Sequence, residues 1–165
     1  MIVLTESRLK KLVEEEKNKG KKIVTTNGTF DILHIAHKRN LEQARACGNI
    51  LIALVNSDAS VKRAKGEERP YNPEEERAEM IDAYKCIDYT FVFDEDTPLN
   101  LLELIQPNYH VKGGTYIEER VAKEREIVEA HGGRCIYLPE VEGKSSTKTI
   151  ERIRNIKPNG LENKS

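Results

Sequence analysis

The chain has 165 residues, of which 38% are hydrophobic and 33% are charged, a mixture typical of a single water-soluble domain. Its 27 basic and 28 acidic side chains leave a net charge of -1, and aromatic residues make up 5% with no Trp. This composition argues against a general nucleic-acid binder, and no stretch reaches the ~18 apolar residues that a membrane span requires. We therefore expect neither a nucleic-acid nor a membrane partner.

The three cysteines, Cys47, Cys86 and Cys135, are far apart and form no C-x-x-C pair, so neither a zinc site nor a redox motif is indicated. We expect them to be buried free thiols in a reducing compartment. Residues 1–10 include Glu6 and lack the apolar core of a secretion signal. The sequence therefore predicts a cytoplasmic protein.

The first half of the chain alternates helix-like and strand-like segments. In order, we expect a helix over 7–19, a strand over 23–26, a helix from residue 36 or 37 to 47, and a strand over 50–55. The last of these is apolar without alternation, which indicates a strand buried on both faces.

The alternation continues in the second half. The expected elements are a helix from 72–75 with Asn72 as its cap, a strand over 89–93, a helix over 97–106, a strand over 109–112, a helix over 117–130, a strand over 135–138, and a helix from residue 146 or 147. Such alternation predicts a Rossmann-like, doubly wound parallel α/β sheet in a single domain. We assign that domain to residues 1–157, with the helix of 1–20 packed on it, and a polar tail to 158–165.

A doubly wound sheet binds ligands beyond the carboxyl ends of its strands, where the strand order reverses. The turns expected to reach that crevice span residues 27–37, 56–65, 112–116 and 144–149. Two histidines outside these turns, His110 and His131, are expected to be structural.

The strongest chemical signal is the first of these turns, which reads N-G-T-F-D-I-L-H-I-A-H. Gly28 permits a close approach of the backbone to a phosphate, and His34 and His37 are three residues apart at the start of a helix. Peptide N–H groups and the positive end of the helix dipole favour an anion beside them. The alternative is that one histidine caps the helix while the other packs on the sheet; the spacing after a strand and a glycine turn favours the phosphate interpretation.

Other residues could complete a polyphosphate site. The hydroxyls of Ser146 and Thr147, at the start of the last helix, could hold phosphates or act as an ordinary helix cap. Candidate charge neutralisers are Lys62 and Lys65, which could equally lie in a solvated loop, and Arg77, which could instead form an exposed ion pair with a neighbouring glutamate. Asp31 is expected to steady its turn rather than to reach a metal through water.

The turn over 27–37 resembles the G-x-F-D-x-x-H-x-G-H motif of the cytidylyltransferase-like nucleotidylyltransferases. Further segments are similar to the heptose-phosphate adenylyltransferase branch of that family. They are V-N-S-D-A-S-V-K from Val55, R-P-Y-N-P-E-E-E-R from Arg69, F-D-E-D-T-P-L from Phe93, V-K-G-G-T-Y from Val111 and S-S-T-K-T-I-E-R-I-R from Ser145. The resemblance extends over residues 23–154.

The resemblance implies transfer of AMP from ATP to a sugar 1-phosphate, with heptose 1-phosphate as the leading acceptor, Mg²⁺ as the cofactor without direct protein ligands, and a homodimer. The implied catalytic residues are His34, His37, Lys62 and Arg77. The implied nucleotide-binding residues are Asn27, Gly28, Thr29, Phe30, Asp31, Lys112, Gly113, Gly114, Thr115, Tyr116, Ser145, Ser146 and Thr147. The implied sugar-phosphate-binding residues are Asn56, Asp58 and Lys65.

Three positions depart from the family pattern: Ala36 replaces a glycine between the histidines, Thr29 a cysteine, and Thr115 an aspartate. The last change leaves open cytidylyl transfer from CTP to glycerol 3-phosphate or a similar polyol phosphate. A non-catalytic nucleotide-binding module is a further alternative, disfavoured by the histidines and the S-S-T segment occurring together. At this length we expect no fused sugar kinase in the chain.

Overall fold

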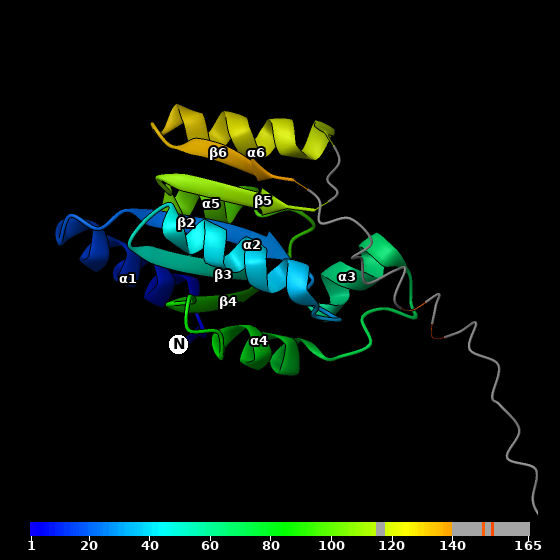
Figure 1. Ribbon diagram of the computed structural model, residues 1–165. Helices are drawn as coiled ribbons and strands as arrows, with labels where there is room; N and C mark the ends of the chain where they lie inside the picture. The colour runs from blue at the N-terminus through cyan, green and yellow to red at the C-terminus, as the bar shows by residue number, and fades with distance from the viewer. Residues whose placement is uncertain (115–117, 140–149, 151–152, 154–165) are drawn as a thin grey trace, which may run out of the picture.

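The computed structural model describes residues 1–114, 118–139, 150 and 153. Six parallel strands form one sheet in the order β1-β4-β3-β2-β5-β6 (Figure 1). The strands are β1 (Ile2–Val3), β2 (Ile23–Gly28), β3 (Ile50–Asn56), β4 (Tyr89–Phe93), β5 (Tyr109–Gly113) and β6 (Arg134–Leu138). The predicted doubly wound parallel α/β sheet is confirmed.

Helices connect the strands. They are α1 (Glu6–Asn18), α2 (Ile35–Ala46), α3 (Asp58–Lys65), α4 (Glu74–Asp82), α5 (Leu99–Ile105) and α6 (Glu118–Ala130). Five of them match the expected helices to within a few residues. The N-cap of α4 is Pro73 rather than Asn72, because the Asn72 side chain hydrogen-bonds to Asp31 instead.

Two elements were not predicted. β1 has only two residues, too few to show a periodicity, and it is recognisable as a strand only through its pairing with β4. Part of the turn expected over 56–65 is the helix α3, which begins where the Ser57 hydroxyl accepts a hydrogen bond from the Ser60 N–H. The segment is rich in charged residues, and the buried face of the helix consists only of Ser60 and Val61, so no helical periodicity was recognisable.

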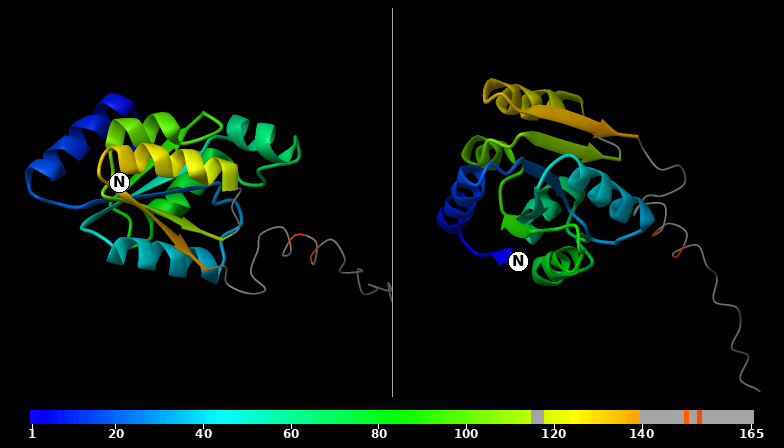
Figure 2. Two further views of the ribbon diagram at one scale, coloured as in Figure 1. Left: turned by 90° about the horizontal axis from the view of Figure 1, so that it is seen from above. Right: turned by 60° about the vertical axis from the view of Figure 1, so that its left-hand side comes forward.

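The sheet is covered on both faces because its central strand is apolar on both. In β3, Ile50, Ile52 and Leu54 pack with α1 and α5, whereas Leu51, Ala53 and Val55 pack with α2 and α4. Figure 2 shows α1 and α5 on the side of the sheet opposite to α2. The three cysteines are free but only partly buried, not fully buried as expected.

The strand order reverses at β2, which lies at the centre of the sheet. The chain runs outward from β2 to β3 and β4, and then crosses to β5 and β6 on the other side. Helix α2 packs closely over this crossing point: a Cβ added at Gly113 would lie 2.1 Å from Asn40 Nδ2. The carboxyl ends of β2 and β5 are therefore held side by side, where a doubly wound sheet binds its ligand.

The interior of the sheet accounts for much of the stability. We predict that Leu54→Ala, at a fully buried position, lowers the free energy of unfolding by about 2–5 kcal/mol because it removes packed methyl groups and leaves a cavity. The matched control is Leu4→Ala, since Leu4 is 87% exposed and its loss should change little. Urea unfolding of both variants measures the difference, and equal effects would contradict the assignment of the core.

Candidate functional site

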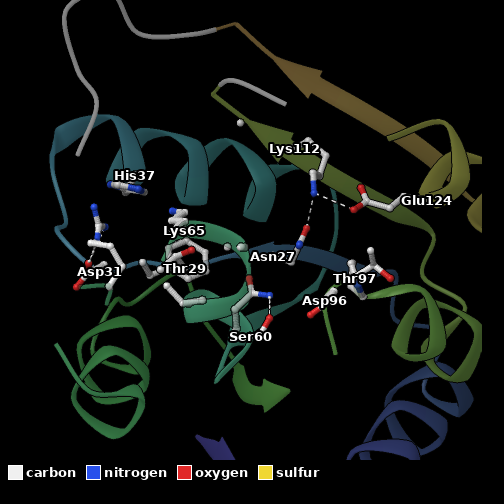
Figure 3. Close-up of a pocket in the computed structure, with 18 of the residues that line it drawn as sticks. Asn27, Thr29, Asp31, His37, Ser60, Lys65, Asp96, Thr97, Lys112 and Glu124 are labelled. Atoms are coloured by element: carbon white, nitrogen blue, oxygen red, sulfur yellow. Dashed lines mark hydrogen bonds and ion pairs between the residues drawn. The ribbon is translucent and has the colours of Figure 1, made fainter. Parts of the chain in front are cut away.

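A cavity of about 370 Å³ opens at the carboxyl ends of the strands (Figure 3). Its walls come from the carboxyl ends of β2, β3 and β5, from the turns after β2 and β4, from helices α2, α3 and α6, and from the segment between α3 and α4. The residues that line it are Asn27, Gly28, Thr29, Phe30, Asp31, His37, Asn56, Ser60, Val61, Ala64, Lys65, Arg69, Asp96, Thr97, Pro98, Lys112, Gly113, Val121 and Glu124. The cavity lies at the predicted switch point.

The turn after β2 is fixed by Phe30 and Asp31. Phe30 is buried with a positive φ of 52°, and its ring lies so close that a Cβ at Gly28 would be 3.2 Å from it. The buried Asp31 carboxylate accepts hydrogen bonds from the N–H groups of Tyr71 and Asn72 and pairs with Arg69 at 2.6 Å. Asp31 therefore steadies the turn, as expected, by joining it to the segment before α4.

These contacts also set the charge of Asp31. Burial alone would raise the pKa of its carboxyl, but the backbone N–H groups of Asn72 and Tyr71, together with the Arg69 guanidinium, outweigh it and hold the pKa below its usual value. Asp31 is thus an ionised anchor whose oxygens are already engaged.

The histidine pair lies at the start of α2. The His34 N–H donates a hydrogen bond to His37 Nδ1 at 3.2 Å, and the ring centroids are 4.0 Å apart. Of the two, only His37 is part of the cavity lining; His34 is the N-cap residue of α2, and its ring lies against that of His37. The expectation that both imidazoles line the cavity is therefore met by His37 alone.

His37 is a neutral imidazole near pH 7. Burial, and then the neighbouring His34 and Lys65, lower its pKa to about 4. Since Nδ1 accepts the His34 N–H, the proton of the neutral ring is on Nε2. His37 can therefore donate one hydrogen bond without already holding a positive charge.

Two cations stand beside His37. Lys65 extends from the end of α3 along the cavity, and burial of its ammonium group, followed by the charge of Arg69, lowers its pKa. Arg69 is held by Asp31 and lies 4.8 Å from the centre of the Tyr71 ring. Together they make this end of the cavity attractive to an anion.

Arg77 differs from both expectations for it. Its side chain is fully buried rather than exposed, and it pairs with Asp58 at 2.7 Å rather than with a glutamate of its own helix. It also donates to the carbonyl oxygens of Thr29 at 2.5 Å and Asn72 at 2.9 Å. Arg77 is absent from the residues that line the cavity, so its contacts make it a brace behind the wall.

At the opposite end of the cavity, polar side chains meet at the mouth of β5. Lys112 Nζ donates to Asn27 Oδ1 at 2.7 Å and to Glu124 Oε1 at 3.0 Å (Figure 3). Nearby, Asn56 Nδ2 donates to Ser60 Oγ at 3.1 Å, and Asp96 pairs with Arg63 at 2.7 Å. This end presents amide, hydroxyl and carboxylate groups rather than a cluster of cations.

The structure brings together ten of the candidate residues around one cavity: Asn27, Gly28, Thr29, Phe30, Asp31, His37, Asn56, Lys65, Lys112 and Gly113. Five others do not line it: His34, Lys62, Asp58, Arg77 and Gly114. The candidates Thr115, Tyr116, Ser145, Ser146 and Thr147 lie outside the described residues.

Several lining residues were not predicted as site residues. Arg69, Asp96 and Thr97 lie inside segments that carried the family resemblance, so that signal was available but was not assigned to them. Glu124 lies in the middle of a strongly charged helical segment, where no local pattern separates an inward carboxylate from its solvated neighbours. Only the three-dimensional packing of α6 identifies it.

Within the described ranges, no three His, Cys, Asp or Glu side chains are grouped as ligands for a metal ion. In the same part of the chain, every helix is too short or too polar to cross a membrane.

We predict that Arg77→Gln lowers the free energy of unfolding by about 3 kcal/mol, because it leaves a carboxylate and two carbonyl oxygens without their buried partner. The control is Arg63→Gln, which removes an exposed arginine from its ion pair with Asp96 and should have little effect. Urea unfolding measures both. A loss below about 1 kcal/mol for Arg77→Gln would show that it is no brace.

The pH dependence of stability should report His37. Its folded-state pKa of about 4 is below the ordinary value of 6.5, so the folded protein takes up the proton less readily than the unfolded chain. This contribution to stability is complete above about pH 6.5 and is lost as the pH falls towards 4. We expect an imidazole titration near pH 4 in the NMR spectrum that is missing in His37→Asn, and a weaker acid destabilisation of that variant. A midpoint near 6.5 would contradict the assignment.

A family model described as Cytidylyltransferase-like matches residues 25–152. The Bifunctional protein HldE of Geotalea uraniireducens is 50% identical over 143 residues, which are 87% of this chain and 29% of that protein. The Bifunctional protein HldE of Citrobacter koseri is 45% identical over 152 residues, which are 92% of this chain and 32% of that protein. The chain thus spans less than a third of the length of these relatives.

Solved structures share the fold. The lipopolysaccharide core biosynthesis protein from Thermoplasma volcanium has a TM-score of 0.60 at 23% identity, covering 76% of this chain and 100% of that one. The pantothenate synthetase from Thermus thermophilus has a TM-score of 0.53 at 17% identity, covering 85% and 62%. The family match includes most of β2, the strands β3 to β6, the turn at the switch point and the residues that line the cavity, and the chain belongs to the cytidylyltransferase-like family.

Proposed function

We propose that this chain is a nucleotidylyltransferase that transfers AMP from ATP to a sugar 1-phosphate and releases pyrophosphate, with heptose 1-phosphate as the acceptor and ADP-heptose as the product. The observation that carries the proposal is the gathering of His37, Lys65 and Arg69 around one cavity at the start of α2. The choice of ATP and of a heptose rests on the motif resemblance and on the 50% identity to HldE.

The proposed reaction is an in-line displacement. A phosphate oxygen of the acceptor forms a bond to the α-phosphorus while the bond from that phosphorus to the β-phosphate bridging oxygen breaks. The attacking phosphate is already anionic, so the site needs no strong general base. Its contribution is to position both substrates and to stabilise charge that develops on the α- and β-phosphates.

His37, Lys65 and Arg69 are suited to that task. The Nε2–H of His37 is a donor on a ring whose proton position is fixed by the His34 N–H. The positive end of the α2 dipole lies beside it. Lys65 and Arg69 supply the charge, and Arg69 is held in place by Asp31. Ser145, Ser146 and Thr147 remain the proposed second clamp on the triphosphate.

The residues present fit a Mg²⁺ ion that arrives on the triphosphate. The carboxylates that line the cavity are already paired: Asp31 with Arg69, Asp96 with Arg63, and Glu124 with Lys112. The residues that hold the phosphates, led by His37 and Lys65, would therefore hold the ion indirectly. When bound, Mg²⁺ would neutralise phosphate charge while keeping several of its waters.

The acceptor is proposed to enter beside Asn56 and Lys65. Asn56, Ser60 and Thr97 supply the amide and hydroxyl groups that recognise sugar hydroxyls, and Lys65, which lines the same cavity, supplies a charge for the sugar phosphate. Asp58 is less suited to this role than expected, because its carboxylate pairs with Arg77. We further propose that the enzyme works in the cytoplasm, as the residue pattern predicts, and as a homodimer, as the family resemblance implies.

The test is pyrophosphate release from ATP or CTP with a panel of sugar 1-phosphates and polyol phosphates. We expect turnover with ATP and heptose 1-phosphate. His37→Asn should lower kcat by roughly 10²–10³, by analogy with the loss of one transition-state donor. The control is His131→Asn, which alters a surface hydrogen bond with Glu103.

Each other outcome of that assay has a definite meaning. Turnover with CTP and glycerol 3-phosphate instead of ATP would replace the adenylyl assignment with the cytidylyl one. Binding of a triphosphate without pyrophosphate release from any acceptor would favour a non-catalytic nucleotide-binding module. A kcat for His37→Asn within about threefold of the unmodified protein would remove His37 from the proposed site.

A further inference from the structure

A row of polar side chains crosses the interior beneath the cavity, from β2 through β5 to α6. Thr25 and His110 are 0% exposed and Glu124 is 3% exposed, and Glu124 leads to Lys112 at the cavity wall. Burying such groups is costly unless each is hydrogen-bonded. The proposed reaction makes no use of His110 or Glu124, so the row calls for an explanation of its own.

The proton positions in this row follow from its distances. Thr25 Oγ1 lies 2.8 Å from His110 Nδ1, and His110 Nε2 lies 3.4 Å from Glu124 Oε2. Burial lowers the pKa of His110, which is therefore neutral. With one ring proton, the consistent assignment has the Thr25 hydroxyl donating to Nδ1 and Nε2–H directed at Glu124.

Glu124 is ionised despite its burial. Burial alone would raise the pKa of its carboxyl, but the contacts with His110 and Lys112 outweigh it and hold the pKa below its usual value. One carboxylate oxygen faces His110 and the other accepts from Lys112 Nζ. Glu124 thus lies at the cavity wall between the His110 ring and the Lys112 ammonium, with one oxygen towards each.

Lys112 and Glu124 both line the cavity, and Lys112 is the member that carries hydrogen-bond donors into it. Its ammonium carries three N–H donors, and among the described residues two acceptors are present: Asn27 Oδ1 at 2.7 Å and Glu124 Oε1 at 3.0 Å. The side chain is 15% exposed and lines the cavity, so one donor remains for a ligand there. Figure 3 shows Lys112 joined by dashed lines to Asn27 and to Glu124. A lysine side chain is normally mobile, and these two contacts restrain it.

We propose that the Lys112 ammonium donates its remaining N–H to a phosphate oxygen of the bound nucleoside triphosphate, and that Glu124, oriented by His110, is the positioning residue that holds it there. The proposal rests on the proposed function. A purely structural pair in this place would gain little from its charges, because a buried ion pair is often no more stable than apolar residues of the same size. The placement of a point charge at a cavity wall suits a phosphate ligand.

The experiment is a double-mutant cycle of Glu124→Gln and Lys112→Met, in which kcat/KM and the affinity for ATP are measured. We expect Lys112→Met to lower kcat/KM about 100-fold and Glu124→Gln to lower it about tenfold. In the Lys112→Met background, Glu124→Gln should have less than a twofold effect, because Glu124 acts through Lys112. Equal effects of Glu124→Gln in both backgrounds, or losses below twofold for both single variants, would overturn the proposal.

Two additions keep the result decisive. Should Glu124→Gln fail to fold, Glu124→Asp keeps the charge but retracts it by one methylene, and it should lower kcat/KM only when Lys112 is present. The affinity for ATP can be measured by calorimetry without turnover. Glu124→Gln should weaken that affinity at least fivefold when Lys112 is present, and not in the Lys112→Met variant. The calorimetry can show that Glu124→Gln weakens ATP binding only when Lys112 is present, while the unmodified chain releases no pyrophosphate. In that case the proposed reaction fails and the role of Glu124 stands.

Discussion

The Arg77 guanidinium is enclosed at the point where three segments of the chain meet. It binds the carbonyl oxygen of Thr29 after β2, the carboxylate of Asp58 at the start of α3, and the carbonyl oxygen of Asn72 before α4. A planar group with donors in fixed directions can hold three acceptors at once, which a lysine ammonium cannot do in the same geometry. Arg77 therefore ties together the segments that form the wall of the cavity around Thr29, and Asp31 ties the same turn to the segment before α4.

These pairings explain how several cationic side chains lie close together at the end of the cavity beside α2. Arg77 and Arg69 are each paired with an aspartate, and His37 is neutral, so the positive groups near the start of α2 do not all repel one another. The remaining charge is that of Lys65, whose pKa is lowered by the same surroundings. The cationic side chains that could bind an anion are thus present in the folded protein with limited repulsion between them.

The sequence was sufficient for the fold class because the apolar run of β3 and the alternation of elements are local patterns. It also placed the turn over 27–37 at the cavity, because a strand followed by a glycine turn and a helix is a local pattern. It failed for Arg77 and Glu124, since a charged residue in a charged helical segment has the same local pattern whether it points inward or outward. The division of labour between His34 and His37 depends on rotation about the start of α2, which spacing does not fix.

The contact between Gly113 and Asn40 has an evolutionary consequence. Any side chain at position 113 would displace that of Asn40, and so disturb the helix α2 whose first turn carries His37. Relatives that diversify towards other substrates are therefore expected to vary the far rim, around Asn56 and Thr97, while this seam stays invariant. Changes of substrate specificity are therefore expected on the side of the cavity formed by Asn56 and Thr97.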